Sequence, residues 1–186
     1  MLRLSVVIAS TRPGRVGLPV GTWFAEAARA HGGFEVAVED LAERALPVFD
    51  EPKHPRLRQY EHDHTRRWSE AVEAADAFVF VVPEYNHGPA PALINALTYL
   101  VQEWARKPAA FVNYGGVSGG VRGAQSYKAV LTTFKIMPLP ESVTIPFVQQ
   151  HMADGAFKPN EQHEAAVAPM LDELRLWAEA LKPLRG

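Results

Sequence analysis

Hydroxyl and guanidinium side chains crowd the stretch STRPGR, residues 10–15, between an apolar segment and a helical pattern. The free N–H groups and the dipole at a helix N-terminus favour an anion, and Ser10, Arg12 and Arg15 can complete a phosphate cradle there. Neither the G-x-x-x-x-G-K-[ST] pattern of a P-loop nor the G-x-G-x-x-G pattern of a dinucleotide site is present. The stretch therefore predicts a site for a phosphate monoester. The alternative is a polar turn with solvated arginines, which the dipole disfavours because it repels two cations at this end.

A second stretch, PEYNHGPAP at residues 83–91, has a backbone shaped by three prolines and one glycine. Tyr85 offers an aromatic edge, and the Asn86 amide can both donate and accept hydrogen bonds. The loop therefore suits a flat heteroaromatic ring. Two alternatives stay open, namely an acid–base pair with Glu84 as general base and His87 as proton donor, and a plain polar turn.

The third stretch, YGGVSGGVRG at residues 114–123, holds five glycines in ten residues. Glycine lets backbone amides approach a ligand closely, and successive amides can form an anion-accepting nest. The alternative is a short loop made of two left-handed turns.

These three stretches must be positioned by the elements between them, and the hydrophobic pattern alternates between strands and helices. The predicted strands span 2–9, 34–41, 76–82, 108–114 and 139–146, and the predicted helices span 18–31, 91–104, 120–134 and 161–181. Right-handed crossovers then give a doubly wound, five-stranded parallel α/β sheet with the order 2-1-3-4-5, in one domain over residues 1–186. In such a sheet the three stretches follow strands 1, 3 and 4 and meet at the carboxyl edge, where ligands bind.

Composition narrows the class of partner. The chain is 47% apolar, has a formal net charge of −2 and contains no cysteine. A slightly acidic chain lacks the basic face that nucleic acids and anionic membranes require, so we expect neither as a partner. The absence of cysteine is typical of a reducing compartment, and the N-terminal apolar segment is too short for a signal peptide. Both observations predict a cytoplasmic protein.

The stretches STRPGR, PEYNHGPAPALINAL and YGGVSGGVRG, in this order and spacing, resemble the NADPH-dependent FMN reductase family. This family contains flavodoxin-like flavoproteins, among them quinone, azo-dye and chromate reductases. The resemblance implies bound FMN, with NADPH or NADH as co-substrate and no metal. It places the FMN phosphate on Ser10, Arg12, Arg15, Val16 and Gly17, and the isoalloxazine ring on Pro83, Glu84, Tyr85, Asn86, Gly115, Gly116 and Ser118. No side chain is implied as catalytic, because flavin N5 carries the hydride.

By this resemblance the protein is an NAD(P)H oxidoreductase that transfers two electrons to quinones or related acceptors in a ping-pong sequence. The alternative is a non-catalytic flavin protein, either an electron carrier or a redox-responsive interaction protein. Electron carriers usually present a strongly acidic docking face. The net charge of this chain is near zero, which disfavours the carrier alternative.

The resemblance also implies a homodimer, which can pair into a tetramer. Helices 91–104 and 120–134 would form the dimer interface through Leu97, Val101, Trp104 and Leu131. The polar segment 50–68 resists this interpretation, and we expect it to lie over the rim of the site as a lid. A metal site at His62, Asp63 and His64 is a weaker alternative, because one loop without further ligands rarely suffices.

Overall fold

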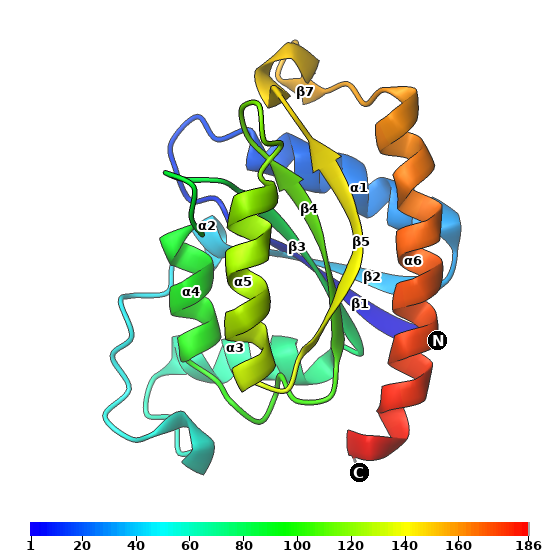
Figure 1. The fold of residues 1–186 in the computed structure, drawn as a ribbon. Helices are drawn as coiled ribbons and strands as arrows, with labels where there is room; N and C mark the ends of the chain where they lie inside the picture. Colours follow the sequence, from blue (N-terminus) through cyan, green and yellow to red (C-terminus); the bar gives the residue numbers. More distant parts are fainter. Residues whose placement is uncertain (186) are drawn as a thin grey trace.

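Five parallel strands form a single sheet in the computed structural model, which describes residues 1–185 (Figure 1). They pair in the order β2-β1-β3-β4-β5, which confirms the predicted flavodoxin-like topology. The strands are β1 (Leu2–Ile8), β2 (Phe34–Asp40), β3 (Ala77–Pro83), β4 (Pro108–Tyr114) and β5 (Met137–Ile145). A short antiparallel pair, β6 (Met152–Ala153) and β7 (Ala156–Phe157), follows β5.

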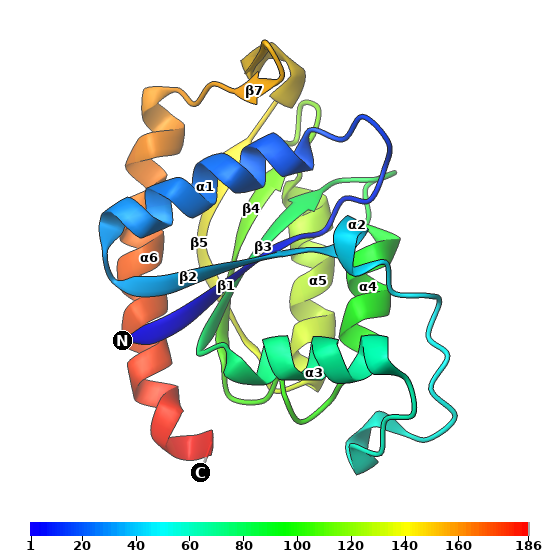
Figure 2. The ribbon, with the colours of Figure 1, turned by 180° about the vertical axis from the view of Figure 1, so that it is seen from behind.

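Helices cover both faces of the sheet, as the two opposite views show (Figures 1 and 2). One face carries α1 (Gly17–His31) and α6 (Glu161–Leu181), and the other carries α3 (Asp63–Ala74), α4 (Pro91–Thr98) and α5 (Val121–Thr133). A one-turn helix, α2 (Leu41–Arg44), follows β2. The 3-10 turns are η1 (Pro55–Leu57), η2 (Val148–His151) and η3 (Lys182–Arg185).

Strand β3 shows why its sequence is a continuous apolar run. Val79 and Val81 pack toward α1 and α6, whereas Phe78 and Phe80 pack toward α3, α4 and α5. All four side chains are fully buried. A strand covered on both faces has no solvent side on which to place polar residues. Burying each phenylalanine contributes about 1.5 to 3 kcal/mol.

The structure corrects the predicted helix 91–104 and removes three of the four residues, all but the half-exposed Val101, from the predicted dimer interface. Helix α4 ends at Thr98, and the chain then turns so that Trp104 packs on the ring of Phe78 at 5.0 Å between centroids. The Trp104 indole also donates to the Leu97 carbonyl (3.3 Å), which satisfies a group at the end of the helix. Leu97, Trp104 and Leu131 are fully buried within this one chain. They stabilise its own core, so they are not available to a second subunit.

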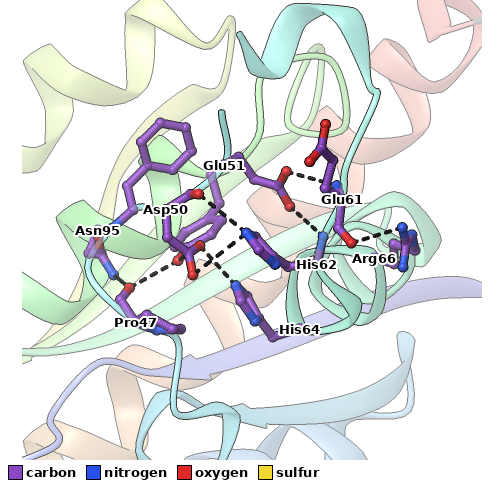
Figure 3. Close-up of polar contacts among 10 residues, drawn as sticks. Pro47, Asp50, Glu51, Glu61, His62, His64, Arg66 and Asn95 are labelled. Atoms are coloured by element: carbon purple, nitrogen blue, oxygen red, sulfur yellow. Dashed lines mark hydrogen bonds and ion pairs between the residues drawn. The ribbon is translucent and has the colours of Figure 1, made fainter. Parts of the chain in front are cut away.

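The expectation that segment 50–68 is a lid is also wrong. The segment runs along the outside of α4, away from the three loops, and begins α3 (Figure 2). It is held there because its carboxylates have partners. Asp50 accepts from the Tyr99 hydroxyl (2.8 Å) and lies 3.0 Å from the His64 Nε2, and Glu51 accepts the backbone N–H groups of Glu61 and His62 (Figure 3).

The weaker metal alternative at His62 and His64 finds no support in this arrangement. Within residues 1–185 no group of three or more acidic or histidine side chains is arranged to hold a metal ion. The two imidazole rings instead stack with 5.1 Å between centroids and approach Asp50 (Figure 3).

Candidate functional site

The loops after β1, β3 and β4 meet at the carboxyl edge of the sheet, as their order predicts. Two cavities there are lined by residues of the predicted cofactor site. The larger, of about 710 Å³, is bounded by the loop after β1 and by residues 84–92. The smaller, of about 80 Å³, is lined by Ser10, Arg12, Val16 and Tyr114 among others. Arg12 and Tyr85 line both, so the two cavities adjoin.

The smaller cavity faces the N-terminus of α1. Val16 occupies the N-cap position, no side chain caps the helix, and its first turn carries no acidic residue. Helix N-termini leave N–H groups without intrahelical partners, which side chains, water or an anion then satisfy. The Ser10 and Tyr85 hydroxyls lie 3.0 Å apart in a hydrogen bond. This bond joins the loop after β1 to the loop after β3 at the wall of the cavity.

The Tyr114 hydroxyl is buried and has no hydrogen-bond partner in the described chain, although the side chain lines the small cavity. Burial raises the pKa of this tyrosine by more than the neighbouring Ser10 hydroxyl lowers it, so the group stays a neutral donor. Sequence reasoning missed Tyr114, because an aromatic residue that ends a buried strand resembles an ordinary core residue. Its place at the carboxyl end of β4 was the available signal.

Gly17 lets helix α1 approach this hydroxyl. A Cβ atom on Gly17 would lie 2.4 Å from the Tyr114 Oη and 3.0 Å from the Ser10 Cβ. Contacts this short do not occur, so any side chain at position 17 would push the tyrosine or the helix aside. The glycine therefore fixes the width of the small cavity.

Arg15 lines the small cavity, but its guanidinium is already engaged. Its Nη1 and Nη2 both donate to the Asp40 carboxylate at 2.6 Å, and Nη1 also donates to the Ser10 carbonyl at 2.8 Å. Asp40 in turn accepts the N–H of Ala42 and caps α2. The bidentate pair joins the loop after β1 to the end of β2. The role of Arg15 as a phosphate ligand stays a prediction, whereas Arg12 is exposed between the two cavities.

The loop after β3 is a tight hairpin. Tyr85 and Gly88 exchange backbone hydrogen bonds of 3.1 and 2.8 Å, and Asn86 and His87 between them have φ angles of 52° and 64°. Two successive left-handed residues define a type I′ turn, which matches the natural twist of a hairpin. The turn places the exposed Asn86 and His87 at the tip and leaves Tyr85 half-buried at the cavity wall.

Glu84 joins this loop to the next one. Its carboxylate accepts the Ser118 hydroxyl (2.9 Å), the Arg122 N–H (3.0 Å) and the Arg122 guanidinium (3.2 Å). Burial raises the pKa of Glu84, but the hydrogen bonds from Ser118, Gly123 and Arg122 outweigh it and lower the pKa below its usual value. A carboxylate held ionised in this way is a weak base. The geometry therefore favours a bridging role for Glu84 over the acid–base alternative.

Replacing Glu84 with glutamine should destabilise the junction of the two loops. We expect a loss of about 1 to 2 kcal/mol in the free energy of unfolding, because charge-assisted hydrogen bonds to Ser118 and Arg122 are weakened. The wild-type advantage should be full above the usual pKa of a glutamate and should disappear as pH falls through the lowered folded pKa. Urea unfolding at several pH values measures this, with the exposed Glu26→Gln as matched control. A pH-independent difference would contradict the ionic role.

In the glycine loop after β4, only one of the two backbone N–H groups predicted to contact a ligand is free to do so. The Gly115 N–H donates to the Ile145 carbonyl at 3.2 Å, whereas the Gly116 N–H has no protein acceptor within residues 1–185. Gly119 and Gly120 take left-handed conformations, with φ angles of 61° and 85°, and lead into α5. Of the predicted pair, Gly116 is the amide that can meet a ligand.

Comparison with known proteins identifies the family of this chain. The sequence profile of the family described as NADPH-dependent FMN reductase matches residues 2–150. A Nectria protein named NAD(P)H-dependent FMN reductase is 33% identical over 195 aligned residues, which cover 99% of this chain and 97% of the relative. A Schizosaccharomyces pombe protein with the same description is 33% identical over 147 residues, covering 77% and 74%.

Solved structures agree on the fold. FerB from Paracoccus denitrificans, described as a flavoenzyme NAD(P)H:(acceptor) oxidoreductase, superposes with a TM-score of 0.74 at 20% identity, covering 97% of this chain and 99% of that one. This likeness concerns the arrangement of strands and helices. The family itself is shown by the profile match over residues 2–150 and by the fungal relatives. The chain belongs to the NADPH-dependent FMN reductase family.

Proposed function

We propose that this enzyme passes two electrons from NAD(P)H, through FMN, to a quinone or a related acceptor such as a flavin, an azo dye or chromate. FMN as the flavin and NAD(P)H as co-substrate follow from the family to which the chain belongs. The acceptor class, the order of the two half-reactions and the residue assignments are the proposal.

One observation carries the assignment of the phosphate end. The buried Tyr114 hydroxyl without a partner and the uncapped N-terminus of α1 line the same small cavity. Both supply donors, and a cavity of about 80 Å³ suits a phosphate group. The residues present therefore fit a phosphate monoester, with Ser10, Arg12 and the N–H groups after Val16 as further donors.

The larger cavity would take the flat end of the cofactor. Tyr85 and Asn86 bound it on the hairpin side, and Glu84 holds Ser118 and the glycine loop against that hairpin. Bound FMN would supply hydride acceptance and donation at its N5. The chain contributes orientation, exclusion of water and one N–H donor at Gly116, which would stabilise negative charge at the pyrimidine end.

Binding of FMN and riboflavin should differ strongly, because the small cavity recognises the phosphate. We expect Arg12→Ala to weaken FMN by about 1.5 to 3 kcal/mol through loss of a charge-assisted hydrogen bond, and to leave riboflavin affinity unchanged. Fluorescence titration of both flavins measures this, with the exposed Arg29→Ala, which lines neither cavity, as control. Equal affinities of the wild-type protein for FMN and riboflavin would refute the phosphate assignment.

Steady-state kinetics should show NAD(P)H and the acceptor using the site in turn. One cavity of about 710 Å³ lies beside Tyr85 and Asn86, so both substrates would occupy the same place. We expect parallel double-reciprocal lines with a quinone acceptor. Intersecting lines would show that both bind together, and absence of turnover would favour the electron carrier or interaction protein.

Location and assembly are proposals of the same kind. Residues 1–185 contain no helix that is long and apolar enough to cross a membrane. We propose a cytoplasmic homodimer that can pair into a tetramer, on the strength of the family resemblance and the absence of cysteine.

A further inference from the structure

A second cavity, of about 600 Å³, lies at the opposite, amino-terminal edge of the sheet. It is lined by residues of η1, of η3 and of the turns that lead into β4 and β5. These segments lie toward the lower side of the view in Figure 1. Its charged lining consists of six cations, Arg56, Arg58, Arg106, Lys107, Lys135 and Arg185, and two acids, Glu73 and Glu103. The whole chain has a net charge of −2, so this concentration of positive charge is local.

Most of these cations lack an acidic partner. Arg58 pairs with Glu73 and Glu103, and Arg185 pairs with Asp76. Arg56, Arg106, Lys107 and Lys135 make no ion pair with a carboxylate among residues 1–185. Cations brought together without counterions repel one another, and a bound anion would relieve that repulsion.

Lys107 is the buried member of the group. It is 4% exposed, and its ammonium donates to the carbonyls of Val72 (2.7 Å) and Glu73 (3.0 Å) at the end of α3. Burial lowers the pKa of Lys107 to about 8, and the positive charge of Arg185 lowers it further. The carboxylates of Glu73, Asp76 and Glu103 raise the pKa, but by less than burial lowers it. The two carbonyls are neutral and none of the nearby carboxylates forms an ion pair with Lys107, so an anionic ligand would supply the direct partner that the ammonium lacks.

Two further groups in the cavity wall have unused hydrogen-bonding atoms. The Arg185 Nε and Nη2 are buried without a partner, and so is the Oε2 of Glu103, whose side chain is fully buried. The Nε and Nη2 edge of a guanidinium matches two oxygens of a phosphate, and a small rotation of the Arg185 side chain would be needed to present this shielded edge to a ligand. An acceptor such as Glu103 Oε2 would suit a ligand hydroxyl.

We propose that this cavity binds a small organic phosphate, at a site separate from the flavin site. Several unpaired cations suit a dianion better than a singly charged carboxylate. The volume exceeds what one phosphate group needs, and Val101, Ala105 and Phe134 supply an apolar wall for an organic body. Segment 50–68 thereby gains a role, because η1 and Arg58 form one side of the cavity.

The test uses the FMN-loaded enzyme, so that the flavin phosphate site is already filled. Calorimetric titration at low salt and pH 7 compares AMP with inorganic phosphate and adenosine. We expect AMP to bind, inorganic phosphate to bind more weakly, and adenosine to show no heat of binding. Absence of AMP binding, or equal binding of AMP and adenosine, would overturn the proposal.

Variants locate the site. Lys135→Glu lies at the exposed rim and should weaken AMP by about tenfold, which corresponds to about 1.4 kcal/mol. Lys107→Met should weaken it further, but it also removes two buried hydrogen bonds, so the rim variant is the decisive one. Lys158 is exposed and does not line the cavity. Lys158→Glu makes the same charge change and therefore serves as control. Equal loss in Lys135→Glu and Lys158→Glu would show a general charge effect and overturn the assignment.

Discussion

Gly120→Ala should lower the free energy of unfolding by about 3 kcal/mol or more. The residue has a φ angle of 85°, which strains any side chain, and an added Cβ would lie 2.6 Å from the Tyr114 nitrogen and 2.7 Å from its carbonyl oxygen. Backbone atoms at the end of β4 cannot move aside as a flexible side chain would. For a chain of this size the loss corresponds to a fall of roughly 6–12 °C in Tm.

Gly116→Ala is the matched control within the same loop. An added Cβ on Gly116 meets no atom within 4 Å, and its φ angle is not positive. We therefore expect its unfolding free energy to stay within about 0.5 kcal/mol of wild type. Urea unfolding of the two apoproteins gives the comparison. Equal losses would show that the loop needs flexibility rather than the particular conformation at Gly120.

The glycine pairs illustrate what sequence can predict about this site. Five glycines in ten residues indicated a loop of close backbone approach, and the strand order placed it beside the other two stretches. The sequence does not indicate which of these glycines are needed for the fold and which can contact a ligand. Gly119 and Gly120 are left-handed and enter α5, whereas Gly116 keeps a free N–H. That division depends on contacts with β4 and β5, which are distant in sequence.

Side-chain roles were hidden for the same reason. Arg15 was expected at a phosphate, but its partner Asp40 ends β2, twenty-five residues away, and only the pairing of β1 with β2 brings them together. Glu84 was assigned to the flavin ring or to proton transfer, and its bonds to Ser118 and Arg122 follow from the pairing of β3 with β4. Residue type and position at a strand end predicted that these residues belong to the site, and tertiary contacts decided what each one does.

The predicted helix 91–104 was wrong in its last turns for a different physical reason. Residues 91–104 have a helical pattern, so Trp104 was placed on a helix face. The indole instead gains burial against Trp68 and Phe78 by leaving the helix, with ring centroids 5.7 and 5.0 Å away. Burial of an aromatic side chain overrides local helix propensity, and no local pattern records it.

Tyr114→Phe should separate flavin binding from stability. The hydroxyl is buried without a partner, so removing it from the apoprotein relieves an unsatisfied polar group and leaves the unfolding free energy unchanged or slightly higher. If the hydroxyl donates to the FMN phosphate, the same change should weaken FMN about tenfold or more, and riboflavin should be unaffected. Flavin titration and apoprotein unfolding measure the two effects. A stability loss with unchanged FMN affinity would make Tyr114 a structural residue only.

Gly17→Ala tests the same cavity from the opposite wall, and we expect at least a hundredfold loss of FMN affinity. The added methyl group would lie 2.4 Å from the Tyr114 Oη, so the tyrosine or the N-terminus of α1 must move, and both would supply donors at the proposed phosphate site. Combining it with Tyr114→Phe removes the clashing oxygen and leaves the ring Cζ at 3.4 Å and the Ser10 Cβ at 3.0 Å. The double variant should therefore regain stability relative to Gly17→Ala, while FMN affinity stays at or below that of Tyr114→Phe. A double variant as unstable as Gly17→Ala would show that position 17 and the Tyr114 hydroxyl do not meet, and would contradict the cavity wall described here.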